Sequence, residues 1–314
     1  MENILLSVVI PVYNAELFIE KTIDSITCQL RKQFEIIAVN DGSTDRSLDI
    51  LNKLSTKYDV LKIVNQENKG ATFARNNGLS HAQGKYIIFF DSDDVFENDV
   101  LTEMVDLIEK EESDLLLCNY SMVDKNLNEI SKVVIDDNLK ICKNELLNTI
   151  PFPGNKIYSL DIIKKYKILF DPVKIGQDLN FFLKYCAFVN KVSIYKKSAV
   201  KYRILSSSIS NSYDSRIIEI VKSMNYTFDF YKSIGKYNEY VEILDLIALK
   251  HYVFQFSKLR FINDKYLRNR LLRELKRNIF KSIKPLNLSK IGNIKFVIRL
   301  LLSYYKTRII ILIG

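Results

Sequence analysis

Three carboxylates crowd into the short segment Asp91-Ser92-Asp93-Asp94, directly after the apolar run of residues 86–90. Such an unbroken run predicts a strand buried on both faces, so the acidic segment follows the carboxyl end of that strand. Open α/β sheets bind ligands at that edge. Carboxylates this close repel one another unless positive charge lies among them, and a hard divalent cation that bridges phosphate oxygens commonly supplies it. The segment therefore predicts a metal and phosphate site, and the alternative is that one Asp caps a helix beginning near Asn98.

A second acidic turn, Asp41-Gly42-Ser43-Thr44-Asp45, follows another strand-like run at residues 34–40 and precedes a helical pattern. Asp-Gly is a turn signal, and Ser43 or Thr44 can cap the helix. These structural roles leave Asp41 without a task. Its carboxylate is therefore a candidate for ligand binding.

The elements that must position these side chains follow from the same patterns. The apolar run at residues 6–10 predicts the first strand, and the segment from Pro11 to Asn14 ends it. Polar side chains are thus expected at one edge of the sheet, after successive strands. Strands are expected near residues 6–10, 34–40, 60–64, 86–90 and 115–120, and helices near residues 16–30, 44–58, 70–83 and 98–111.

Four segments resemble the inverting family-2 glycosyltransferases in residue type, order and spacing. They are Ser7–Asn14, Val39–Asp45, Asn68–Gly70 with Ala74–Gly78, and Phe90–Asp94. The resemblance covers the first third of the chain and implies a fold of the GT-A type, an α/β nucleotide-binding domain with a mixed central sheet. It also implies transfer of a hexose from a nucleotide-sugar, usually a UDP-sugar, to an acceptor hydroxyl.

The resemblance further implies roles for individual residues at the donor site. Asp41 would hold the nucleotide base, Arg75 would lie along the nucleotide, and Asp91 would contact the ribose side. Asp93 would ligate Mn²⁺ or Mg²⁺ on the diphosphate. A cation and an arginine offset the negative charge that develops on a diphosphate leaving group. The residues implied for donor binding are Pro11, Val12, Tyr13, Asn14, Asp41, Asn68, Arg75, Asp91, Ser92, Asp93 and Arg203.

Arg203 belongs to a stretch that is similar to a mobile loop of these enzymes. Tyr202-Arg203 is followed by Ser207–Ser210, and the loop would close over the diphosphate. Residues 204–206 stand where the family often has a His, so a His contact to metal or phosphate is missing. Simpler alternatives are that Arg203 is a satisfied surface residue, Arg75 a solvated helix residue and Asn68 a turn former.

The general base is expected in the segment Gly176–Phe182, which resembles the Glu-Asp motif of the family. Gln177 replaces the usual Glu, and Asp178 keeps the position of the base. In an inverting displacement one carboxylate suffices, because it only has to take the proton of the acceptor hydroxyl. The alternative is that Asp178 caps a helix from Leu179 to Phe188.

Composition limits the remaining possibilities. The 314 residues are 47% hydrophobic, which is enough for one large or two modest cores. The four cysteines show no metal-binding spacing and fit a reducing cytosol, and two histidines exclude a His-rich zinc site.

Charge is concentrated at the end of the chain. From Lys250 onward there are 16 Lys and Arg residues and two acidic ones, Asp264 and Glu274, whereas the whole chain carries +9. Apolar residues recur at helical spacing between these cations, which predicts helices on the anionic inner face of the cell membrane. A helical bundle that only packs on the catalytic domain is the alternative. Nucleic acid is not an expected partner, because the cations alternate with long aliphatic residues.

The expected organisation is a GT-A domain at residues 1–212 and a helical, basic region at residues 213–314. Within the first, residues 1–120 would bind the nucleotide-sugar and residues 121–212 the acceptor. By resemblance, the acceptor would be a lipid-linked oligosaccharide in capsular or surface polysaccharide synthesis. Two rival functions are a sugar-1-phosphate nucleotidyltransferase, for which no early Gly-rich loop is present, and a non-catalytic, membrane-associated carbohydrate-binding protein.

Overall fold

The computed structural model of the protein describes residues 4–29, 33–136, 146–147, 149–205 and 213–283. It divides into two compact units. The first comprises residues 1–172 and 188–206, and the second comprises residues 173–187 and 207–314. The Ser207–Ser210 loop and residues 284–314 of the predicted basic region lie outside the described residues.

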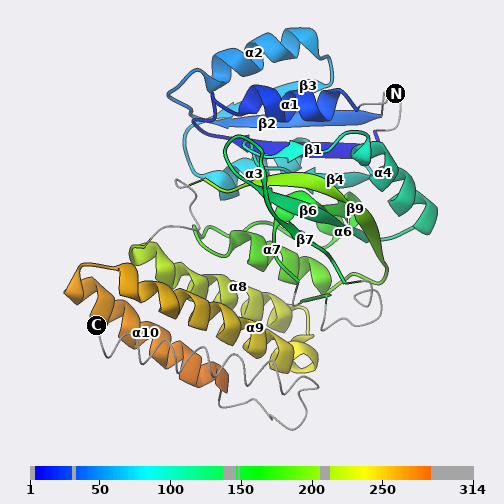
Figure 1. The fold of residues 1–314 in the computed structure, drawn as a ribbon. Helices are drawn as coiled ribbons and strands as arrows, with labels where there is room; N and C mark the ends of the chain where they lie inside the picture. The colour runs from blue at the N-terminus through cyan, green and yellow to red at the C-terminus, as the bar shows by residue number, and fades with distance from the viewer. Residues whose placement is uncertain (1–3, 30–32, 137–145, 148, 206–212, 284–314) are drawn as a thin grey trace. The chain divides into compact units, whose positions relative to one another are not determined.

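The first unit is built on a mixed sheet (Figure 1). Its strand order is β3-β2-β1-β4-β8-β6-β9-β5, and β7 pairs with β6. The strands β1 to β4 are mutually parallel, β8 is antiparallel to both its neighbours, and β6 is parallel to β9. The strands are β1 (Leu6–Val12), β2 (Phe34–Asp41), β3 (Leu61–Gln66), β4 (Tyr86–Phe89), β5 (Val95–Phe96), β6 (Leu115–Val123), β7 (Glu129–Val133), β8 (Lys156–Ser159) and β9 (Val192–Arg203).

The central strands are buried on both faces, as their unbroken apolar runs predict. Every residue of β2 and β4 is buried, and helices pack on the sheet. At Gly78 a Cβ would lie 2.4 Å from Cγ1 of Val9, so glycine allows α3 to approach β1 closely. The helices of this unit are α1 (Ile19–Thr27), α2 (Ser47–Lys57), α3 (Ala71–His81), α4 (Val100–Glu111) and α6 (Leu160–Lys165), with a short η2 (Pro153–Asn155).

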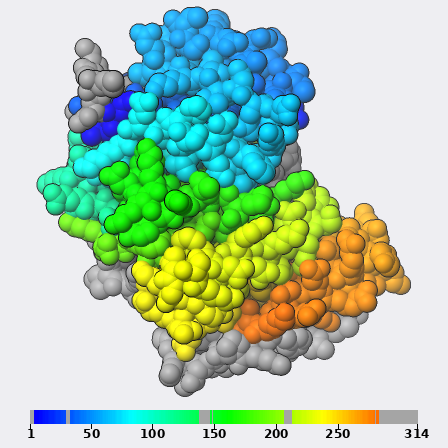
Figure 2. All heavy atoms as spheres, turned by 180° about the vertical axis from the view of Figure 1, so that it is seen from behind, coloured from blue at the N-terminus to red at the C-terminus, as the bar shows by residue number. Residues whose placement is uncertain are grey.

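The second unit is helical in its described residues. Its longest helix, α9, packs against α8 and α10, and α8 also packs against α7 (Figures 1 and 2). No helix in the described part of the chain is long and apolar enough to cross a bilayer. The helices are α7 (Gln177–Cys186), η4 (Ser215–Ile218), α8 (Glu219–Ser233), α9 (Tyr237–Lys258), η5 (Leu259–Phe261) and α10 (Lys265–Ile283).

The predicted fold class is confirmed, a mixed α/β domain followed by a helical region. Each strand and helix expected in the first 120 residues is present, and its ends lie within one helical turn of the prediction. The predicted boundary after residue 212 differs from the observed units, because residues 173–187, which contain α7, group with the C-terminal helices.

Candidate active site

The carboxyl ends of β1, β2 and β4 meet at one edge of the sheet. This follows from the position of β1, which pairs in parallel with β2 on one side and β4 on the other. Val12 of β1 pairs with Asn40 of β2, so the loop after β1 starts beside Asp41. The strand β4 ends at Phe89, and Asp91 follows on the same edge. The predicted polar strand ends are therefore brought together.

The loops after β1 and β2 are hydrogen-bonded to each other. The backbone N–H of Asn14 donates to Oγ of Ser43 at 3.2 Å, and the backbone N–H of Thr44 donates to Oδ1 of Asn14 at 2.8 Å. Ser43 and Thr44 thus join two loops, and the prediction that one of them caps α2 is wrong. Tyr13, between these contacts and the end of β1, is 49% exposed and available at the edge.

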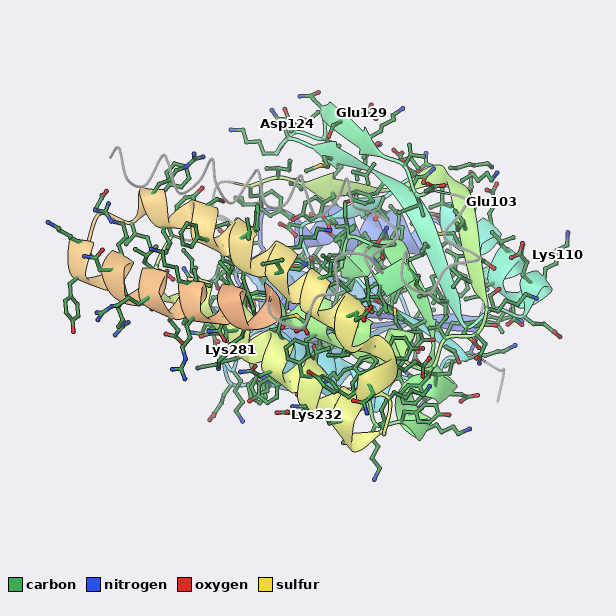
Figure 3. The ribbon with its side chains drawn as sticks, turned by 90° about the horizontal axis from the view of Figure 1, so that it is seen from below. Glu103, Lys110, Asp124, Glu129, Lys232 and Lys281 are labelled. Atoms are coloured by element: carbon green, nitrogen blue, oxygen red, sulfur yellow. The ribbon has the colours of Figure 1, made fainter. Side chains whose placement is uncertain are left out.

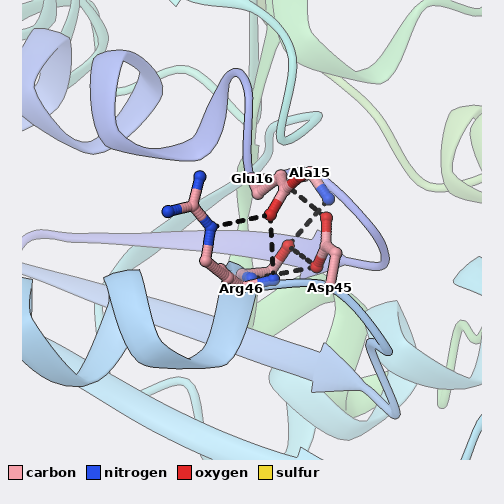
Figure 4. Close-up of polar contacts among 5 residues, drawn as sticks. Ala15, Glu16, Asp45 and Arg46 are labelled. Carbon is pink, nitrogen blue, oxygen red and sulfur yellow. Dashed lines mark hydrogen bonds and ion pairs between the residues drawn. The ribbon is translucent and has the colours of Figure 1, made fainter.

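Asp45 fastens the start of α2 to the chain after β1 (Figure 4). Its Oδ1 accepts the backbone N–H of Ser47 at 2.9 Å, and its Oδ2 accepts that of Glu16 at 3.0 Å. Oγ of Ser47 accepts the backbone N–H of Ala15 at 2.8 Å. The carboxylate of Glu16 in turn accepts the backbone N–H and Nε of Arg46 at 3.1 and 3.3 Å. These reciprocal bonds fix the wall of the site beside the loop after β1.

Asp41 has a structural task that its sequence context did not suggest. The carboxylate is 2% exposed, Oδ1 accepts the backbone N–H of Lys69, and Oδ2 accepts that of Gly70, each at 2.8 Å. Gly42 has φ +66°, and a Cβ there would lie 2.8 Å from the backbone N of Asn68. Asp41 and Gly42 therefore hold the exposed Asn68 loop against the end of β2.

Arg75 is buried in α3 and paired with the first carboxylate of the acidic segment. Its Nη2 lies 2.6 Å from Oδ1 of Asp91, and the two side chains are 5% and 28% exposed. The guanidinium also lies 5.5 Å from the ring centre of Phe170. The alternative that Arg75 is a solvated helix residue is therefore wrong, and Arg75 orients Asp91.

The other two carboxylates of the segment, Asp93 and Asp94, have raised pKa values, because nearby positive charge offsets their burial and mutual repulsion only in part. Burial and the negative charge of Asp91 raise the pKa of Asp93 to about 6. Burial and the charges of Asp91 and Asp93 raise the pKa of Asp94 well above its ordinary value. Arg203 acts against both shifts, and its backbone N–H donates to Oδ1 of Asp94 at 2.8 Å. No Asp of the segment caps α4, whose N-cap is Asp99.

Arg203 lies beside the acidic segment at the end of β9. Its side chain is 4% exposed, so the alternative of a surface arginine is wrong. The guanidinium lies 4.6 Å from the ring centre of Phe18, and Nη1 donates to the carbonyl of Lys125 at 3.0 Å. That carbonyl belongs to the β6–β7 hairpin, which carries Asp124 and Glu129 (Figure 3). Nε and Nη2 of Arg203 are buried and form no hydrogen bond with the described residues.

The oxygen atoms at this edge suit a hard cation that is bound mainly by the oxygens of a diphosphate. Within the described ranges, no group of three or more His, Cys, Asp or Glu side chains is arranged to hold a metal ion. A cation on a diphosphate needs only one or two carboxylates, since phosphate oxygens and water supply the rest. Asp93 is a carboxylate with a raised pKa, and Oδ2 of the adjacent Asp94 is buried and forms no hydrogen bond with any described residue. Added positive charge at Asp93 would offset the negative charge of this segment, so Asp93 fits a site for Mn²⁺ or Mg²⁺.

Asp178 is held on a rigid helix start in the second unit, whereas the residues above belong to the first. Gly176, with φ +83°, is the N-cap of α7, and Asp178 lies in the first turn. The alternative that Asp178 caps the helix is therefore wrong. Oγ of Ser223 donates to the carbonyl of Gly176 at 2.6 Å, and Nδ2 of Asn180 donates to the carbonyl of Ser223 at 3.1 Å. The predicted neighbour, Gln177, is 9% exposed.

The sequence patterns did not identify Thr22, and the structure gives Lys156 a structural role. Thr22 is buried in α1 and contacts the backbone of the acidic segment. Its only sequence signal is a polar residue beside apolar Ile19 and Ile23. Lys156 is 1% exposed, and its Nζ donates to the carbonyl of Phe152 at 2.7 Å, so it stabilises the loop before β8.

Comparison with known proteins identifies the family. Residues 7–167 match the family model described as glycosyl transferase family 2. The Bacillus subtilis protein EpsH, provisionally described as a glycosyltransferase, is 30% identical over 80% of this chain and 76% of its own length.

Solved structures show the same fold. Residues 1–349 of Staphylococcus aureus TarS in complex with UDP-GlcNAc give a TM-score of 0.61 at 22% identity, over 89% of each chain. The mannosyltransferase PcManGT of Pyrobaculum calidifontis, in complex with GDP-Man and Mn²⁺, gives a TM-score of 0.57 at 16% identity, over 91% of this chain and 88% of its own.

The family model includes the strand ends, the Arg75–Asp91 pair and Asp93, and it spans more than half of the chain. This decides against a sugar-1-phosphate nucleotidyltransferase and a non-catalytic carbohydrate-binding protein. The fold is that of the GT-A glycosyltransferases. The chain belongs to glycosyl transferase family 2 and is a glycosyltransferase.

Proposed function

We propose that this glycosyltransferase moves a sugar, with inversion, from a UDP-sugar to a hydroxyl of a lipid-linked oligosaccharide. The acceptor would serve capsular or surface polysaccharide synthesis, and the enzyme would work in the cytoplasm on the inner face of the cell membrane. The observation that carries the donor assignment is the charge arrangement at the sheet edge. Of two buried arginines, Arg75 is paired with Asp91, and the positive charge of Arg203 acts on Asp93.

This arrangement suits a nucleoside diphosphate. The loop from Pro11 to Asn14, with exposed Tyr13 and the neighbouring Asn68 loop, offers a surface for the base and the nucleoside. Arg75 orients Asp91 towards the ribose side, and Ser92 connects it to Asp93. Structural relatives that were solved with UDP-GlcNAc and with GDP-Man support a nucleotide-sugar donor.

Asp93 would hold Mn²⁺ or Mg²⁺, which supplies positive charge to the diphosphate oxygens when bound. Arg203 would add a fixed cation, and its Nε and Nη2, which form no hydrogen bond with the described residues, would donate to a phosphate oxygen. Because Phe18 and the Lys125 carbonyl hold the guanidinium, little reorganisation is needed when charge develops.

Asp178 would be the general base. Gln177 cannot ionise, so Asp178 is the member of that pair that can take a proton from the acceptor hydroxyl. The helix start at Gly176 is fixed on α8 through Ser223, which keeps Asp178 on a rigid support. The attack of the hydroxyl opposite the leaving diphosphate would invert the anomeric configuration.

The membrane assignment rests on the charge of α10. Its buried stripe consists of Leu271, Leu275 and Ile279, and the opposite face exposes Arg270, Arg273, Arg277 and Lys281. None of these four cations forms an ion pair within the described residues. A cationic helix face of this kind is attracted to anionic lipid headgroups, where the lipid-linked acceptor would also be found.

A nucleotide-sugar panel tests the proposal. We expect the purified protein with Mn²⁺ to hydrolyse or transfer from UDP-sugars, and to be inactive with dTDP- and GDP-sugars. With an acceptor analogue, the anomeric proton coupling measured by NMR should show the configuration opposite to that of the donor. Retention of configuration, or activity with GDP-sugars alone, would contradict the mechanism or the donor class respectively.

A further inference from the structure

The backbone of the acidic segment is held by the buried hydroxyl of Thr22, which has no assigned part in donor binding. Oγ1 of Thr22 lies 2.9 Å from the carbonyl oxygen of Ser92 and 2.8 Å from that of Asp94. These two carbonyls stand immediately before and after Asp93. Since a hydroxyl has one proton, it can serve both only where they converge, and this constrains the backbone through Asp93.

The same face of α1 continues the contact. Thr22 and Ser25 are one helical turn apart, so their side chains lie on the same side of α1, and Gln29 follows just after the end of the helix. Oγ of Ser25 accepts the backbone N–H of Phe96 at 3.2 Å. Nε2 of Gln29 donates to the carbonyl of Glu97 at 2.7 Å. Polar side chains of α1 and of the turn after it thus hold the chain from the acidic segment to Glu97, just after β5.

Asp94 makes the link to the other side of the site. Its side chain is 0% exposed, and Oδ1 accepts the backbone N–H of Arg203 at 2.8 Å. A carboxylate that accepts a backbone N–H forms a strong, short bond. The bond from Asp94 fixes the backbone of Arg203, and Phe18 and the carbonyl of Lys125 hold its guanidinium. Both ends of the Arg203 side chain are therefore held.

We propose that Thr22 and Asp94 are positioning residues for glycosyl transfer, which together fix the separation between the Asp93 carboxylate and the Arg203 guanidinium. Thr22 orients Asp93 through the two flanking carbonyls, and Asp94 anchors Arg203 through its backbone. Neither residue touches substrate in this assignment. The inference rests on the proposed donor site, in which both positioned groups face the diphosphate. Misplacement of such groups by about 1 Å can cost roughly 10²-fold in rate.

Paired substitutions test the inference. Thr22→Val keeps the shape of the side chain but removes the hydroxyl, whereas Thr22→Ser keeps the hydroxyl. Asp94→Ala removes the oxygen that accepts the hydrogen bond, whereas Asp94→Asn keeps an oxygen that can accept the Arg203 N–H. Thr27→Val is the matched control, because Oγ1 of Thr27 donates to the carbonyl of Ile23 at 3.0 Å inside the same helix.

We expect Thr22→Val and Asp94→Ala to lower kcat/KM by about tenfold or more, and Thr22→Ser and Asp94→Asn to retain most of it. The Mn²⁺ concentration for half-maximal activity should rise in Thr22→Val, and calorimetry should show weaker binding of UDP in the presence of Mn²⁺. Thr27→Val should resemble the wild type in all three. If Thr22→Ser loses as much kcat/KM as Thr22→Val, the role of the Thr22 hydroxyl is overturned. If Asp94→Asn loses as much as Asp94→Ala, the role of the Asp94 oxygen as a hydrogen-bond acceptor is overturned.

A ligand-free measurement separates this inference from the proposed donor. Amide hydrogen exchange in peptides spanning residues 91–97 and 200–205 should accelerate in Thr22→Val and Asp94→Ala, respectively, and stay unchanged in Thr27→Val. Unchanged exchange in the first two variants would overturn the positioning roles. If the wild type binds no UDP with Mn²⁺, the proposed donor fails, and the exchange data still decide whether Thr22 and Asp94 hold the two segments.

Discussion

Each of the three carboxylates in the acidic segment has a different neighbour, and this separates their roles. Asp91 is paired with Arg75 at 2.6 Å, and Asp94 is committed to the backbone of Arg203. Asp93, between them, has no comparable bond to a cation in the part of the chain that the structure describes, and burial and Asp91 raise its pKa to about 6. Asp93 is therefore the carboxylate with most to gain from a bound divalent cation.

Substitution of Asp93 tests that role. Asp93→Asn should abolish transfer and remove Mn²⁺-dependent UDP binding, because an amide is a weaker ligand and carries no charge. Calorimetry with UDP, with and without Mn²⁺, measures the loss, and an unchanged melting temperature shows that the fold is intact. Asp106→Asn, at an exposed position of α4, is the control. Wild-type activity in excess EDTA would contradict metal use.

Substitution of Asp178 tests the base. Asp178→Asn should reduce kcat by roughly 10²- to 10⁴-fold with little change in donor affinity, because the base acts in the transition state. Steady-state kinetics with a soluble acceptor analogue separates kcat from the donor KM. The matched control is Asp161→Asn, since Asp161 is likewise the second residue of its helix, α6, and is exposed. Full turnover in Asp178→Asn would place the base elsewhere.

At the scale of elements, local sequence patterns predicted the parallel strands of the core. They did not predict the features that depend on contacts between residues far apart in the chain. The apolar runs of β1, β2 and β4 are long and uninterrupted, so they identify buried strands by themselves. The two-residue β5 is set by pairing with β9, about a hundred residues away in sequence, and no local signal marks it. The roles of Thr22, Asp45 and Asp41 escaped for the same reason. Their partners lie on other elements, and only the fold brings them close.

The helix α9 buries an acid that its sequence does not explain. Asp245 is 7% exposed, and burial raises its pKa to about 6. A carboxyl with a raised pKa in the folded state binds a proton more tightly there than in the unfolded chain. Its contribution to stability is therefore complete below about pH 4 and is lost as the pH rises through 6.

We accordingly expect Asp245→Asn to raise the free energy of unfolding at pH 7 by about 1–3 kcal/mol. The difference from the wild type should shrink towards pH 4, where the folded carboxyl is protonated and the unfolded one is close to its own pKa. Melting temperatures at pH 4, 5, 6 and 7 measure this trend. A neutral control is Asp229→Asn on α8, whose side chain is 73% exposed. A wild-type stability that exceeds that of the variant at pH 7 would show that Asp245 has a stabilising ionised role.

At the scale of the whole molecule, charge is divided along the chain. The residues from Lys250 onward hold 16 of the 46 Lys and Arg residues and two of the 37 acidic ones. In the described part of this region, α10 turns its apolar stripe inward and exposes Arg270, Arg273, Arg277 and Lys281. The proposed nucleotide site, by contrast, lies in the first unit and contains the acidic segment. A membrane-bound acceptor and a soluble donor would thus be met by different parts of the chain.

Charge reversal on α10 tests whether that helix holds the enzyme on a membrane. Each cation near an anionic surface contributes about 1 kcal/mol, so Arg270→Glu, Arg273→Glu and Arg277→Glu together should weaken partition onto phosphatidylserine vesicles by on the order of a hundredfold or more. Flotation at low salt measures the partition, and raised salt should weaken binding of the wild type.

A control with the same change in net charge is Lys21→Glu, Lys53→Glu and Lys110→Glu, at exposed positions of the first unit. Hydrolysis of a soluble donor should persist in both variants. If the control loses as much binding as the α10 variant, net charge rather than α10 determines membrane association, and if the wild type does not float, the helices of the second unit only pack.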